Sequence, residues 1–108
     1  MNWIPLQEMG QLDEILTRSH YHLQVIFKHS TRCSISSMVL HRLERDKVPA
    51  GVDFYFLDLL SYRPISSAIA ERFQVHHESP QIIVIKNGDV VYDESHMAIH
   101  MQEITSLV

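Results

Sequence analysis

The sequence predicts an α/β fold, a single domain spanning residues 1–108, in which helices flank a mixed sheet of about four strands. Stretches whose apolar side chains recur at helical spacing alternate with short apolar runs of strand-forming residues. Near the end of the chain, Asn87-Gly88 separates two such runs, as in a β-hairpin. With 108 residues and 45% hydrophobic content, the chain is long enough to bury the core of one domain.

The first half of the chain predicts the order helix, strand, helix, strand. Helical spacing of apolar residues predicts a helix over 9–19, and the apolar run 23–27 is too short for a helix and typical of a buried strand. A second helix is expected from 34 to about 47, because Pro49 then ends the pattern. The run 52–60 is rich in Val, Phe, Tyr and Leu and predicts a second buried strand.

The second half predicts a helix, a hairpin and a final helix. Pro64 suits the first position of a helix that ends near Gln74. The two hairpin strands are expected at 81–86 and 90–92. The closing helix should carry an apolar stripe formed by Met97, Met101, Ile104 and Val108. The predicted order is therefore α-β-α-β-α-β-β-α, with a parallel βαβ part and an antiparallel hairpin.

Composition narrows the classes of function. The formal net charge is −4, and the nine Lys and Arg are scattered, so no nucleic-acid surface is indicated. Neither a basic, apolar leader nor a run of roughly 18 apolar residues is present, so we expect a cytoplasmic protein without a membrane partner. The single cysteine cannot form an internal disulfide, which fits a reducing compartment.

That cysteine, Cys33, lies between the first predicted strand and the helix that follows it. Unpaired N–H groups and the positive end of the helix dipole favour thiolate there and are expected to lower the pKa of the thiol. Lys28, His29 and Arg32 could add positive potential. The alternative is that Cys33 is an inert small hydrophobic residue, but a polar loop is a poor place for core packing. We therefore predict a reactive thiol.

A second loop, 76–81, precedes the hairpin. Its Ser79-Pro80 bond is a candidate cis peptide, since X-Pro is the only bond commonly found cis, although most X-Pro bonds are trans. In the cis form Pro80 is expected opposite Cys33, where neighbouring backbone could hold an extended thiol-bearing substrate by strand-like pairing.

The residues of these loops resemble those of a known family. Cys33-Ser-Ile-Ser36 gives a CxxS motif in which Ser36 stands where a dithiol enzyme has its resolving cysteine, as in the thioredoxin superfamily. More narrowly, Phe27 to Ser36, together with the motifs Arg63-Pro-Ile-Ser66, His77-Glu-Ser-Pro-Gln81 and Ser95-His96, resembles the YtxJ-type monothiol bacilliredoxins over nearly the whole chain. The chain departs from that family at Ser34, where proline is usual.

The resemblance implies a thioredoxin-like fold and an oxidoreductase that removes bacillithiol from client proteins through Cys33, with bacillithiol as thiol co-substrate and no bound cofactor. One thiol cannot complete the cycle, so bacillithiol or a partner reductase must resolve the mixed disulfide. Ser36 could hydrogen-bond the sulfur or serve as a helix cap. The supporting or substrate-binding residues are expected to be Thr31, Arg32, Ser34, Ser36, His77, Ser79 and Pro80.

Other classes stay open at this point. Most of the eight histidines are expected on the solvated surface, and their spacing gives no third metal ligand, whereas His29 and His77 are expected near Cys33, where an imidazolium could favour thiolate. A monothiol glutaredoxin-like protein, using glutathione or binding an iron–sulfur cluster, would share the CxxS turn. A non-catalytic thioredoxin-like binding module would keep the fold with an inert Cys33.

Overall fold

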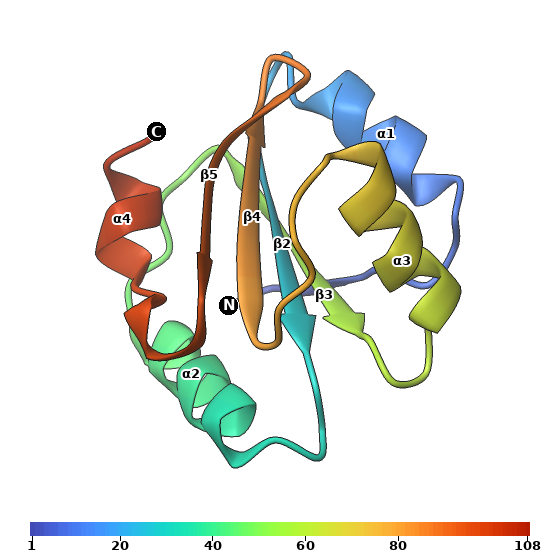
Figure 1. The fold of residues 1–108 in the computed structure, drawn as a ribbon. Coiled ribbons are helices and arrows are strands. Elements are labelled where there is room, and N and C mark those ends of the chain that lie inside the picture. The colour runs from blue at the N-terminus through green and yellow to red at the C-terminus, as the bar shows by residue number, and fades with distance from the viewer.

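The computed structural model describes residues 1–108, and its helices flank a five-stranded mixed sheet (Figure 1). The elements are β1 (Ile4–Pro5), α1 (Gln11–Arg18), β2 (Leu23–His29), α2 (Ser34–Arg45), β3 (Val52–Asp58), α3 (Arg63–Arg72), β4 (Gln81–Lys86), β5 (Asp89–Ser95), the 3₁₀ turn η1 (His96–Ala98) and α4 (Met101–Thr105). The strand order is β1-β3-β2-β4-β5, with β2 parallel to β3 and antiparallel to β4. The predicted α/β class is confirmed, with one strand more than expected.

That extra strand, β1, has only two residues and pairs in parallel with β3. Two residues are too few to produce a recognisable sequence period, which explains why it was not predicted.

The last predicted helix is wrong in extent, because η1 and α4 are separate elements. His96 has a positive φ of 59°, and Ile99 and His100 are extended, so the backbone cannot continue as one helix. Of the predicted stripe, only Met101 and Ile104 are buried.

The hairpin follows the prediction from Asn87-Gly88. These two residues have φ values of 51° and 81°, as a type I′ turn requires. Ser19, at the end of α1, holds the turn: its carbonyl accepts from the Asn87 N–H at 2.8 Å and its Oγ from the Gly88 N–H at 2.9 Å. The hairpin is thereby tied to the first helix, and β5 runs three residues further than predicted.

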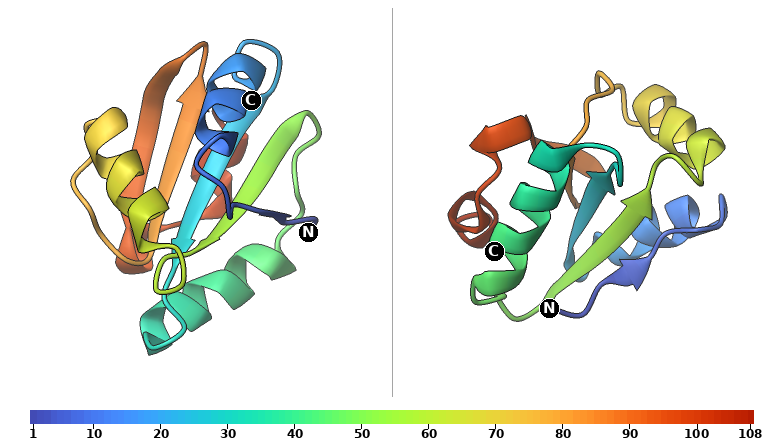
Figure 2. Two further views of the ribbon diagram at one scale, coloured as in Figure 1. Left: turned by 90° about the vertical axis from the view of Figure 1, so that its right-hand side faces the viewer. Right: turned by 90° about the horizontal axis from the view of Figure 1, so that it is seen from below.

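Helices cover both faces of the sheet, as Figures 1 and 2 show, and each face carries its own hydrophobic core. On one face α1 and α3 pack through Leu12, Ile15, Ile65 and Ile69. On the other, α2 and α4 pack through Val39, Leu43, Met101 and Ile104. Strand residues alternate between the two cores, so that Ile26 belongs to the first and Phe27 to the second. This alternation decides where the polar residues at the end of β2 point.

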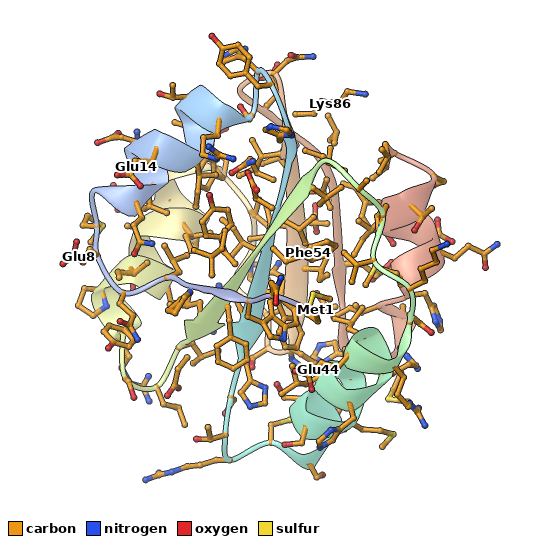
Figure 3. The ribbon with its side chains drawn as sticks, turned by 180° about the vertical axis from the view of Figure 1, so that it is seen from behind. Met1, Glu8, Glu14, Glu44, Phe54 and Lys86 are labelled. Carbon is orange, nitrogen blue, oxygen red and sulfur yellow. The ribbon has the colours of Figure 1, made fainter.

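The N-terminal segment adds aromatic packing on the α2 side. Trp3 stacks on Phe27 with ring centroids 5.6 Å apart and meets Phe54 edge-on. Its indole N–H donates to Glu44 Oε2 on α2 at 3.0 Å. Figure 3, which looks at the β1–β3 edge of the sheet, labels Phe54 and Glu44 close to Met1. The contact joins the start of the chain to the helix that carries Cys33 at its N-terminus.

Candidate functional site

Cys33 is the N-cap residue of α2 and is partly exposed. Its N–H donates to the Ser30 carbonyl at 3.2 Å, and its own carbonyl accepts from Ser37 at 3.1 Å. The backbone N–H groups of residues 34–36 have no acceptor within the chain, and no acidic residue lies in the first turn. Cys33 therefore stands at the free, positive end of the helix, as the sequence predicts.

The exposed neighbours of Cys33 are Thr31, Arg32 and Ser34. None of their side chains makes a hydrogen bond or an ion pair within the chain. They are free to meet a substrate.

Ser36, the last residue of the CxxS motif, points into the protein and is fully buried. Its Oγ accepts from the Ser30 N–H at 3.1 Å and lies 2.7 Å from His29 Nδ1. No hydrogen bond joins it to the Cys33 sulfur. A hydroxyl can donate one hydrogen bond while it accepts another, so Oγ can bind both the Ser30 N–H and a neutral His29 ring. Through these two contacts Ser36 links the loop 30–33 to His29 at the end of β2.

His29 is only 5% exposed, on the α2 side of the sheet. Burial lowers the pKa of its imidazole, against the opposing charges of Asp58 and Glu44. A neutral ring can share the hydrogen bond between Nδ1 and Ser36 Oγ in either tautomer. His29 and Ser36 therefore form a buried neutral pair beneath the Cys33 loop.

Lys28 departs most from the sequence expectation. β2 continues to His29, two residues beyond the predicted strand, so Lys28 points into the α1 and α3 face, not toward Cys33. It is fully buried, and its Nζ lies 2.6 Å from His77 Nδ1. Burial lowers the pKa of Lys28 to about 8, with Glu78 opposing the shift. The pKa of His77, which is exposed at the residue level, is lowered by the partial burial of its ring and then by the Lys28 charge.

The loop before β4 contains a cis Ser79-Pro80 bond, as the sequence suggested. The N–H and C=O of Ser79 make no hydrogen bond within the chain, whereas the Pro80 carbonyl accepts from the His96 N–H at 2.9 Å. Sequence reasoning gave Gln81 no role, yet its buried amide donates to the His76 carbonyl at 2.9 Å and accepts from the Glu78 N–H at 3.4 Å. Gln81 thus fixes the shape of this loop.

Both loops lie at the same end of the sheet. Lys28 on β2 pairs with Gln81 on β4, so the residues after β2 and those before β4 leave the sheet together. The segment between β2 and α2, which contains Cys33, and the segment before β4, which contains Pro80, therefore meet at one end of the sheet (Figure 1). Neither His29 nor His77 hydrogen-bonds the Cys33 sulfur. The His29 imidazole is instead hydrogen-bonded to Ser36, and the His77 imidazole to Lys28.

Seven of the eight histidines are exposed, His29 being the exception. No three His, Cys, Asp or Glu side chains are grouped to hold a metal ion. None of the helices has the length and apolar character needed to cross a bilayer.

Comparison with known proteins gives a consistent assignment. The sequence model of the family described as "Monothiol bacilliredoxin BrxC" matches residues 4–104. A solved structure described as "A putative oxidoreductase with a thioredoxin fold" is 28% identical, with a TM-score of 0.79, and the match covers 95% of this chain and 90% of that one. The thioredoxin of Malassezia sympodialis (16% identity, TM-score 0.72, 98% and 87% covered) and that of Fasciola hepatica (17%, 0.71, 95% and 93%) show the same fold.

Proposed function

The chain belongs to the monothiol bacilliredoxin family and is a thiol–disulfide oxidoreductase, and from that premise we propose that Cys33 removes bacillithiol from mixed disulfides on client proteins. The observation that carries the proposal is the position of the only cysteine: it is the N-cap residue of α2, is partly exposed, and precedes the N–H groups of residues 34–36, which have no acceptor within the chain. At such a position the sulfur can be reached by a substrate disulfide, and the thiolate is the form that attacks.

The first step is an exchange of one disulfide for another. The Cys33 thiolate attacks the bacillithiol sulfur of the mixed disulfide, forming a new S–S bond as the old one breaks. The client sulfur leaves as thiolate and takes a proton from solvent. Electrons balance, because one disulfide is consumed and one is formed.

The second step needs a thiol from outside. In this monothiol CxxS mode Ser36 cannot resolve the adduct, and its hydroxyl is buried against His29 in any case. Free bacillithiol, or a thiol of a partner reductase, attacks the Cys33 adduct and releases bacillithiol disulfide or a mixed disulfide with the partner. A cytoplasmic setting would supply such a reducing thiol.

The client chain would bind across the second loop. The free N–H and C=O of Ser79 offer one extended residue of a client two backbone hydrogen bonds. Thr31, Arg32 and Ser34 are exposed beside the thiol and would contact the same client. Pro80 supports this surface and takes no chemical part.

Intact mass spectrometry tests the proposal. The reduced chain is incubated with bacillithiol disulfide and, separately, with glutathione disulfide, alongside the Cys33→Ser variant. We expect one bacillithiol adduct on the wild type, faster than the glutathione adduct, and none on the variant. Preference for glutathione would instead favour the glutaredoxin-like alternative, and absence of both adducts would leave a binding module.

A further inference from the structure

A pocket lies along α3, between this helix and the segment 74–77, on the face of the sheet opposite α2. Its volume is about 750 Å³, and its wall includes Leu59, Arg63, Ser66, Ser67 and Glu71 together with the imidazoles of His76 and His77. Seven of the ten lining residues are polar or charged. The wall thus offers donors and acceptors beside apolar surface, and a sugar ring, with hydroxyls at its rim and C–H groups on its faces, can use both.

The charges in and behind the pocket favour a carboxylate at one end. Arg63 forms no ion pair within the chain, so its guanidinium fork is available for a bidentate contact. The neutral His77 ring accepts from the buried Lys28 ammonium at Nδ1, which leaves the N–H on Nε2 as a donor. The opposing carboxylates are Glu71 in the wall and Glu78, which is engaged by His96 at 3.2 Å.

The pocket wall also contains a polar atom without a partner. Ser66 is 5% exposed, and its Oγ makes no hydrogen bond. Buried hydroxyls are nearly always hydrogen-bonded, so an orphan in a pocket wall marks a place where a ligand atom or a water is expected.

The pocket is joined to the Cys33 loop through the backbone. The N–H of Leu59, at its edge, donates to the carbonyl of His29 at 3.0 Å. Arg63 begins α3 directly after β3, and His77 precedes β4, so both lie at the same end of the sheet as Cys33.

We propose that this pocket binds the carboxylate-bearing sugar portion of the low-molecular-weight thiol exchanged at Cys33, with Arg63 as the carboxylate contact. The inference rests on the proposed function, and it adds a specificity site for the small thiol. Bacillithiol, a malyl glucosaminide linked to cysteine, has this chemistry; glutathione has carboxylates but no sugar.

Binding can be measured without any redox step. The ¹⁵N-labelled reduced chain is titrated with S-methyl bacillithiol, which cannot form a disulfide, and in parallel with S-methyl glutathione. We expect saturable amide shifts in α3 and 74–77 with the first probe and clearly weaker binding of the second. The Arg63→Gln variant should bind S-methyl bacillithiol about tenfold more weakly or worse, since a charge-assisted contact is lost.

Arg45→Gln is the matched control, because Arg45 is exposed, lies at the far end of α2 and makes no ion pair. It should bind like the wild type. Unshifted α3 and 74–77 amides, equal binding by Arg63→Gln, or equal binding of the two probes would each overturn the inference. Amide shifts without a Cys33 adduct would overturn the proposed function and leave the pocket standing, and an adduct without these shifts would do the reverse.

Discussion

The Ser36→Ala substitution tests how the Cys33 loop is held. It removes the acceptor of the Ser30 N–H (3.1 Å) and the partner of His29 Nδ1 (2.7 Å). Leaving the buried ring nitrogen without a partner costs about 1–3 kcal/mol, and the partly buried N–H adds about 0.5–1 kcal/mol. Alanine regains roughly 0.5 kcal/mol through its helix propensity. The net loss should be about 2 kcal/mol.

Thermal unfolding and hydrogen exchange measure this loss. For a chain of this size, 2 kcal/mol corresponds to a fall in Tm of about 10 °C. The Ser30 amide should also exchange faster, because its acceptor has gone. Ser34→Ala is the matched control: the same change, two residues earlier in the first turn of α2, at an exposed residue without a side-chain hydrogen bond. If both variants unfold at the same temperature, the Ser36 contacts do not hold the loop and the reasoning fails.

Three further outcomes follow from the structure. Lys28→Met should raise the stability at pH 7 by about 1–3 kcal/mol, because a buried ammonium is removed. The Lys28 pKa is about 8 when folded and 10.5 as the reference value, so the unfolded chain binds more protons between these limits and wild-type stability gains with pH. The advantage of Lys28→Met over the wild type, measured by denaturant unfolding, should therefore shrink from pH 8 to 10; a constant difference would refute this. Gly88→Ala places a side chain at a φ of 81° and should cost about 1 kcal/mol by the same assay, whereas an unchanged midpoint would exclude strain at this turn. Leu43→Ala, at a fully buried site on α2, should cost about 2–5 kcal/mol, and a loss below 1 kcal/mol would show that α2 is not anchored there.

Much of the fold was predictable because each long element has a clear period. Helical spacing located α1, α2 and α3, and Asn87-Gly88 located the hairpin turn to the residue. The two-residue β1 gave no period, and the final helix failed because His96 and His100 adopt backbone conformations that the apolar spacing does not encode. Short elements depend on tertiary contacts rather than on local pattern.

The candidate site likewise contains features that local sequence predicts and features that it does not. The place of Cys33 and the Ser79-Pro80 loop followed from local sequence. The partners of Ser36, Lys28 and His77 did not, because each contact joins elements distant in sequence or depends on the face of a strand. Extending the alternation of β2 by two residues would have indicated that Lys28 and His29 point to opposite sides of the sheet.

The central claim is that the Cys33 thiolate takes bacillithiol from a client protein. A bacillithiolated client is mixed with one equivalent of the reduced chain at neutral pH, without other thiols, and both masses are followed with time. The bacillithiol mass should leave the client and appear on the wild-type chain in equal amount, with no transfer to Cys33→Ser. A client that keeps its bacillithiol in the presence of the folded wild-type chain would contradict the account.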